Sequence, residues 1–144
     1  MKKLTVMIAA ILAFAAFGFT PKYGLDRYEV FLNQELIAKI WVNQPDKERV
    51  LQLGKAKPAD HLRVKYIHCN NNGAGTGRSI SLQDQNGNVL KTWTFANPSG
   101  SYAGMPIVVS ELQKMEQSHP GDKLVLYYHS KELLKAELLA RLNF

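Results

Sequence analysis

The sequence is almost without cysteine. Cys69 is the only one among 144 residues, which excludes a disulfide within the chain. Free cysteine is among the most buried residue types, so we expect this thiol to fill a place in the core. Two alternatives stay open, a disulfide to another chain and a metal ligand.

Charge is missing from Leu4 to Phe19, directly after the basic start Lys2-Lys3. A basic start, an apolar run and small residues at its end are the parts of a secretory signal peptide. The run is shorter than the ~20 apolar residues of a spanning helix. We therefore expect residues 1–18 to be a cleaved signal peptide, although cleavage after Ala15 fits as well. Residues 19–144 would then form a single exported β-rich domain, periplasmic or extracellular, with no membrane span left.

Runs of like charge are also missing. The net charge is +6, and loss of Lys2 and Lys3 with the signal peptide lowers it to +4. The basic residues are spread from Lys22 to Arg141 with acids among them. No block of five or six like charges forms. This distribution predicts no nucleic-acid partner.

Motifs of catalysis are missing as well. The sequence has no Gly-x-Ser-x-Gly elbow, the turn that presents a nucleophilic serine. The glycine-rich stretch Gly73–Arg78 lacks the Gly-Lys-Ser/Thr ending of a phosphate-binding P-loop. We expect the domain not to be an enzyme, and the sequence leaves its cofactor, if it has one, unknown.

What the chain has is a series of short alternating segments. In His61–Cys69, Leu62, Val64 and Tyr66 share one face and polar side chains share the other, as in a half-buried antiparallel strand. Arg78–Asp84 and Val89–Phe95 flank an Asn-Gly pair, which predicts a hairpin with a type I′ turn.

Similar signals along the chain predict the fold class. We expect a mainly β protein, an antiparallel β-sandwich or open barrel of about eight short strands. Ser110 and Gln113 have the spacing of a capping box, so one short connecting helix is expected over about 110–117. Glu132–Arg141 is rich in helix formers, but its end alternates. We favour a closing strand that pairs with Lys123–His129.

Three residues are candidate metal ligands, namely His68, Cys69 and His129. Imidazole and thiolate suit zinc or copper. However, neighbouring residues of a strand point to opposite faces, so His68 and Cys69 can share an ion only where the strand ends. His68 and His129 would meet only if their two strands are neighbours. A histidine hydrogen-bonded to the backbone is the competing interpretation.

Candidate ligand-binding residues lie in two loops. Asn70–Arg78 is polar and glycine-rich, and Ala96–Gly104 contains Pro98 and two glycines. The candidates are Asn71, Asn72, Arg78 and Tyr102. Backbone amides beside an arginine can hold an anion or a sugar, whereas a plain hairpin connection explains the same residues. Trp41 and Trp93 have apolar neighbours and are expected in the core.

The leading functional hypothesis is a small non-enzymatic exported β-domain that binds a protein or saccharide through these loops, because loops on a rigid scaffold are where binding usually resides. The alternative is a zinc- or copper-binding or redox-related exported protein that uses His68, Cys69 and His129.

Overall fold

Nine strands and one helix make up the part of the chain that the structure describes. The structure is a computed structural model that describes residues 26–44, 48–69, 73–99 and 104–144. The elements are β1 (Arg27–Leu32), β2 (Glu35–Trp41), β3 (Val50–Gln52), β4 (His61–Ile67), β5 (Arg78–Gln83), β6 (Val89–Phe95), β7 (Met105–Val108), α2 (Val109–Ser118), β8 (Val125–His129) and β9 (Glu137–Asn143). Within these ranges, no helix is long and apolar enough to cross a membrane.

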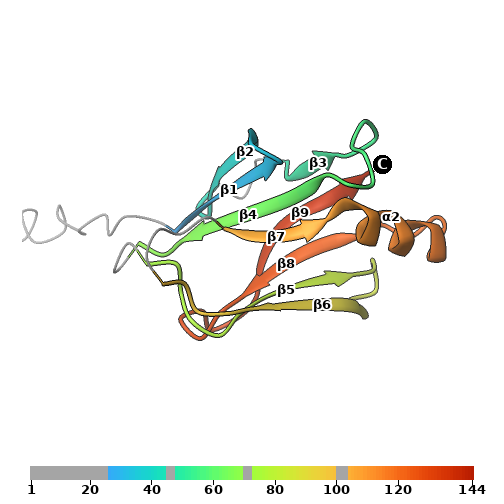
Figure 1. Cartoon of the computed structure of the whole chain (residues 1–144). Helices are drawn as coiled ribbons and strands as arrows, with labels where there is room; N and C mark the ends of the chain where they lie inside the picture. Colours follow the sequence, from blue (N-terminus) through green and yellow to red (C-terminus); the bar gives the residue numbers. More distant parts are fainter. Residues whose placement is uncertain (1–25, 45–47, 70–72, 100–103) are drawn as a thin grey trace, which may run out of the picture.

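The strands form two sheets that pack face to face (Figure 1). One sheet has the order β2-β1-β4-β7 and the other has the order β3-β9-β8-β5-β6. Neighbouring strands are antiparallel except for β3 and β9, which run parallel. The sheets do not close on each other, so the predicted β-sandwich is confirmed over the open barrel.

The core follows from the alternation of the strands. Inward side chains of the two sheets are fully or nearly fully buried, and those in between face solvent. The larger inward side chains of the first sheet are Tyr28, Val30, Leu62, Val64, Tyr66, Met105 and Ile107. Those of the second sheet include Ile80, Leu82, Leu126, Tyr128 and Leu142. The alternating face predicted for His61–Cys69 is therefore the inner face of β4.

A row of tyrosines crosses the core from sheet to sheet. The rings of Tyr28 and Tyr66 lie 6.1 Å apart and nearly parallel. Tyr66 in turn stacks on Tyr128 of the opposite sheet, with ring centroids 4.1 Å apart. Burial raises the pKa of Tyr28 to about 12. Burial, and then the Asp26 carboxylate, raise the pKa of Tyr66 well above its usual range. Both rings therefore stay neutral and apolar in the folded protein.

A β-bulge shapes the edge strand β2. Val30 pairs with Ala38, but the next residue, Phe31, pairs with Leu36. Ile37 is the extra residue, and it packs against the core next to Ala38. Trp41 falls on the outer face opposite Arg27 and is 38% exposed. The expectation that Trp41 is a core residue is therefore wrong, whereas Trp93 does pack against the core.

The hairpin of β5 and β6 is confirmed, but its turn is not type I′. That type needs a positive φ at both central residues, and only Gly87 has one here, at 83°. The amide of Gly87 donates to the carbonyl of Asp84, and Asp84 donates to Asn88. Asp84 also accepts hydrogen bonds from the amides of Asn86 and Asn88. These hydrogen bonds of Asp84 favour a turn that is longer than the two-residue type I′ turn. Gly87 adopts the left-handed conformation in it.

The connecting helix α2 and the C-terminal strand β9 are both present, but the helix begins differently from the prediction. The connecting helix is confirmed, but the capping box is wrong. Helix α2 begins one residue earlier, behind Val108, which makes no side-chain capping bond. The amides of Val109 and Ser110 instead donate to the carbonyls of Asp60 and Pro58. The last segment is the strand β9, and it pairs with β8 as expected.

Replacing Leu126 by alanine tests the packing of the two sheets. The side chain of Leu126 is completely buried between Leu82 and Ala140 in its sheet. We expect the free energy of unfolding to fall by about 2–5 kcal/mol, because the cavity refills only in part. Chemical denaturation measures it. Val89→Ala is the control, since Val89 is 59% exposed, and a cost as large as that of Leu126→Ala would contradict the described core.

Candidate functional site

His68 stands at the centre of a polar cluster at one end of the core. It follows the last residue of β4 and keeps to the inner face, where it is 5% exposed. Its ring lies against the tyrosine row, with centroids 4.8 Å from Tyr66 and 5.9 Å from Tyr128. A buried imidazole is costly unless its nitrogens find partners. Both nitrogens of His68 have them.

Asp26 binds the first nitrogen. Its Oδ2 lies 3.2 Å from Nδ1 of His68 and also accepts a hydrogen bond from the Tyr66 hydroxyl at 3.1 Å. Its Oδ1 accepts the backbone amide of Cys69 at 2.8 Å. An ionised carboxylate only accepts, so the proton of this pair belongs on Nδ1. Asp26 thereby fixes the ring at the point where β4 ends.

Two hydroxyl groups from the other sheet surround the second nitrogen. Nε2 of His68 lies 3.1 Å from the hydroxyl of Tyr128 and 3.3 Å from Oγ of Ser130. Tyr128 ends the inward row of β8, and Ser130 follows the strand and is completely buried. The imidazole therefore joins the two sheets through hydrogen bonds as well as through ring contacts.

Asp26, His68 and Ser130 have the order of groups found in serine hydrolases, an acid, an imidazole and a hydroxyl. Here the serine has no contact with solvent. The backbone of Gly75 covers the imidazole, because a Cβ on Gly75 would lie 2.6 Å from Nε2 of His68. In this geometry the three groups, together with Tyr66 and Tyr128, act as a clamp, which we call the His68 clamp (Asp26, Tyr66, His68, Tyr128 and Ser130).

Residues of the His68 clamp form hydrogen bonds with the backbone of the loop Gly73–Gly77. The amide of His68 donates to the carbonyl of Gly73, and the Tyr128 hydroxyl donates to the carbonyl of Ala74 at 3.3 Å. The loop is also tied to the β8–β9 connection. The amide of Lys131 donates to Thr76, and both the amide and the hydroxyl of Thr76 donate to the Glu132 carboxylate.

The β6–β7 connection joins the same surface. The amide of Gly77 donates to the side-chain oxygen of Asn97 at 3.0 Å, and the guanidinium of Arg78 donates to the carbonyl of Ala96. Three connections that are far apart in the sequence are thus bonded to one another. We call this surface the loop end (Gly73–Arg78, Ala96–Ser99 and Ser130–Ala136). It lies opposite α2 (Figure 1).

Of the predicted metal ligands, the structure brings only His68 into a polar cluster. Cys69 is a free thiol and half-buried. His129 is exposed and pairs with Ser79 in the sheet that does not contain β4. Its neighbours Tyr128 and Ser130 are buried, so His129 lies on the outer face of that sheet. No three His, Cys, Asp or Glu residues that could hold a metal ion come together in the described residues.

Of the predicted ligand-binding residues, Arg78 is at the loop end but only 5% exposed. Its side chain supports the loop rather than facing solvent. Asn71, Asn72 and Tyr102 lie outside the described residues. No pattern in the sequence singles out Asp26, Ser130 or Glu132, because their hydrogen-bond partners described above are 40 to 62 residues away along the chain.

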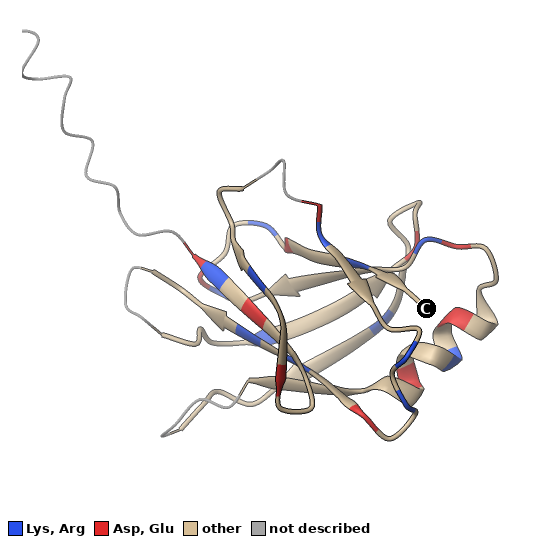
Figure 2. Cartoon of the chain, turned by 90° about the horizontal axis from the view of Figure 1, so that it is seen from above, with Lys and Arg blue, Asp and Glu red and all other residues tan. Residues whose placement is uncertain are grey.

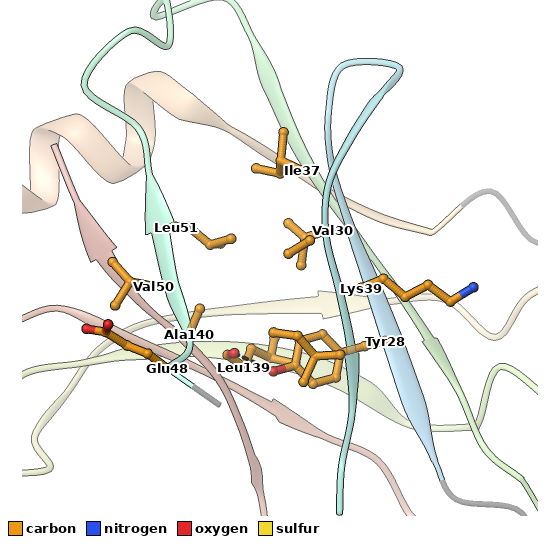
Figure 3. A pocket seen from close by; sticks show the side chains of 11 residues that line it. Tyr28, Val30, Ile37, Lys39, Glu48, Val50, Leu51, Leu139 and Ala140 are labelled. Atoms are coloured by element: carbon orange, nitrogen blue, oxygen red, sulfur yellow. Dashed lines mark hydrogen bonds between the residues drawn. The ribbon is translucent and has the colours of Figure 1, made fainter. Parts of the chain in front are cut away.

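A hollow lies between the open edges of the two sheets, with a volume of about 290 Å³ (Figure 3). Its lining comes from β1, β2, the segment around β3 and β9, and it includes Val30, Ile37 and Leu51. The ammonium group of Lys39 extends away from the apolar side chains (Figure 3). The hollow is near the lower limit of ligand pockets, roughly 300 Å³. Its wall consists mainly of core side chains that neither sheet covers completely.

The carboxylate of Glu132 provides a pH-dependent test of the loop contacts. Desolvation by neighbouring atoms acts to raise its pKa, but hydrogen bonds, first of all those from Thr76, outweigh it and lower the pKa to about 2. The stabilisation is therefore complete above the ordinary pKa near 4.5 and is lost as the pH falls towards 2. Carboxyl NMR titration should give this low pKa, and Thr76→Val, which removes the hydroxyl donor, should raise it. An unchanged pKa in that variant would contradict the contact.

Gly75 tests the close approach of the loop to the imidazole. Alanine at position 75 would bring its Cβ within 2.6 Å of Nε2 of His68 and 2.9 Å of the Tyr128 hydroxyl, at a φ of 77°. Gly87 has a similar φ of 83° and nothing within 4 Å, so Gly87→Ala is a matched control for backbone strain alone. We expect Gly75→Ala to cost about 1–3 kcal/mol more than the control in chemical denaturation. Equal costs would show that the loop does not rest on the clamp.

Comparisons of the chain with known protein families, with curated proteins and with solved structures find no match. The geometry of the loop end and of the sheet faces is therefore the basis on which a function is inferred.

Proposed function

We propose that the chain is a small exported, non-enzymatic binding domain that holds a protein or saccharide partner at the loop end. Export rests on the signal peptide expected over residues 1–18. The observation that carries the binding role is the hydrogen bonding of three separate connections to one another above the His68 clamp.

Such bonding lowers the cost of binding. A loop that is ordered before the partner arrives loses less conformational freedom on association. The loop Gly73–Gly77 contains four glycine or alanine residues among its five, and a stretch of this kind has much freedom to lose. Hydrogen bonds donated by His68 and Tyr128, and those that Thr76 donates to Glu132, restrict it in advance.

The groups presented at the loop end suit a polar partner. Thr76, Asn97, Lys131 and Glu132 are exposed, and they offer hydroxyl, amide, ammonium and carboxylate groups. Saccharide hydroxyls and the backbone of a protein are both recognised by groups of this kind. A buried serine and a covered imidazole favour this role over hydrolysis.

The alternative of a zinc- or copper-binding or redox-related protein has less support. A metal ion at His68 would have to replace Asp26 at Nδ1 or Tyr128 and Ser130 at Nε2. His129 lies on the outer face of the other sheet, away from this cluster. Native mass spectrometry with zinc and copper tests this alternative directly.

Thr76→Ala tests the proposed function. The probe is a panel of neutral oligosaccharides and flexible peptides, titrated into the ¹⁵N-labelled protein. We expect amide shift changes to concentrate at Gly73–Arg78, Ala96–Asn97 and Ser130–Glu132. The variant should bind about tenfold more weakly, because a lost hydrogen bond to a charged group loosens the loop.

Thr92→Ala is the matched control, since Thr92 is exposed on β6 away from the loop end. The proposal fails if the shifts lie elsewhere, if the two variants lose affinity equally, or if no member of the panel binds.

A further inference from the structure

The outer face of the sheet β2-β1-β4-β7 carries an excess of positive charge. Register places Lys39, Glu29 and Lys65 in one row across β2, β1 and β4. The row on one side contains Trp41 and Arg27, and the row on the other contains Phe31 and Arg63. We call this surface the basic face (Arg27, Glu29, Phe31, Lys39, Trp41, Arg63 and Lys65). It holds four cations and one carboxylate. Figure 2 shows the alternating charges at the start of β1, next to the grey N-terminal trace.

The outer face of the other sheet is different. Strand β5 and the edge strand β6 present Ser79, Ser81, Thr92 and Thr94, which pair across the two strands. The next strand, β8, contributes Tyr127 and His129. Neutral hydroxyl groups therefore prevail where the basic face has arginine and lysine. Arg141 of β9 is exposed on this other face but is paired with Glu48, so the basic face is the more positive of the two sheet faces.

The two arginines of the basic face are held by aromatic rings and not by acids. The guanidinium of Arg27 lies 5.3 Å from the ring centre of Trp41, and that of Arg63 lies 5.0 Å from the ring centre of Phe31. Neither arginine has an ion-pair partner in the described part of the chain, and the Nε atom of each is buried without a hydrogen bond.

Both arginines are positioned before any ligand binds. The Arg63 stem packs on the backbone of Gly104, where a Cβ would lie 2.8 Å from Cγ of Arg63. A planar guanidinium stacked on a ring keeps its outer nitrogen atoms available for a carboxylate or sulfate. Arg27 and Arg63 are separated by about 13 Å along the strands, four residues at about 3.3 Å each. Lys65 lies between them in the register of β4.

We propose that the basic face binds an acidic polysaccharide, with carboxylates of successive uronic acid units on Arg27, Lys65 and Arg63. A single small anion cannot reach both arginines, whereas an extended polyanion can. The exposed part of Trp41 beside Arg27 offers an apolar ring edge to a pyranose. This site is separate from the loop end and does not depend on it.

Other polyanionic partners fit the same face less well. A peptide usually joins a sheet by extending its edge, and the bulge at Ile37 interrupts the edge strand β2. A lipid surface favours aromatic side chains that enter the interface, but Arg27 covers one face of the Trp41 ring. The chain also has no dense run of basic residues for nucleic acid.

The test is binding of polygalacturonate to the purified protein by isothermal titration calorimetry. We expect binding that weakens from about 50 to about 200 mM salt. The double variant R27Q/R63Q should bind at least about tenfold more weakly, since each arginine makes charge-assisted hydrogen bonds. R27K/R63K keeps the charge but loses the planar guanidinium groups. Its affinity for polygalacturonate should lie between those of the parent protein and R27Q/R63Q.

The matched control is K114Q/K123Q, which removes the same charge from exposed positions on α2 and just before β8, outside both the basic face and the loop end. It should bind within about twofold of the parent protein, apart from a small general charge effect. Circular dichroism spectra of all variants show whether the fold is kept. Equal losses in the two glutamine variants, or no binding of polygalacturonate, overturn the proposal.

Three further probes separate the partner classes at the same salt concentration. These are polyglutamate, single-stranded DNA and vesicles of mixed neutral and anionic phospholipid. Binding of any of them as tight as that of polygalacturonate, with the same loss in R27Q/R63Q, overturns the assignment to an acidic polysaccharide. Weaker binding of all three supports it.

Discussion

A buried imidazole must have both of its nitrogens bonded, and much of one end of this molecule is arranged around that constraint. His68 reaches Asp26 on one side and two hydroxyl groups on the other. The first partner precedes β1, and the others come from β8 and the residue after it. The constraint therefore ties the first strand, the central strand of one sheet and the central part of the other sheet to a single side chain.

The same constraint explains the shape of the loop above. The loop passes so close to His68 that only a residue without a side chain fits at position 75. Its carbonyls and amides then find partners in Tyr128, Lys131 and Glu132. A polar cluster of this kind specifies one arrangement of the chain, because a half-satisfied cluster is costly. Order at the loop end is thus a consequence of packing inside the sandwich.

The molecule accordingly has two surfaces of different character. The loop end is polar and is held by hydrogen bonds to the loop backbone. The basic face is positively charged and is held by strand register and by the stacking of arginine on aromatic rings. Under the two proposals, the loop end holds one partner while the basic face rests on an acidic polymer. Each surface depends on a different part of the fold.

The fold was largely predictable from the sequence, because alternation marks a strand wherever one face is buried. His61–Cys69 and the hairpin at Asn86-Gly87 are the clearest cases. Local details were less predictable. The turn at Gly87 was set by Asp84, which bonds the amides of Asn86 and Asn88, and the start of α2 was set by contacts with Asp60 and Pro58. Trp41 was misplaced because apolar neighbours do not reveal which face a strand residue takes.

The candidate site was predictable only in part. The sequence singled out His68, since it continues the inward face of β4. It could not indicate Asp26 or Ser130, because a hydrogen bond between distant segments leaves no periodic pattern. The expected meeting of His68 and His129 depended on which strands are neighbours. In the structure β4 and β8 belong to different sheets, and the residue that meets His68 is Tyr128, one position before His129.

The tyrosine row gives the molecule an optical signal of its own. Tyr66 and Tyr128 come from different sheets and stack at 4.1 Å with an angle of 20° between their planes. Ordered aromatic rings produce near-ultraviolet circular dichroism, which disappears when fixed packing is lost. Tyr28 and Tyr66 also resist ionisation while they are buried. Separation of the two sheets would therefore change the ellipticity of these rings and, in alkaline solution, produce tyrosinate absorbance, so the association of the sheets can be followed without an added label.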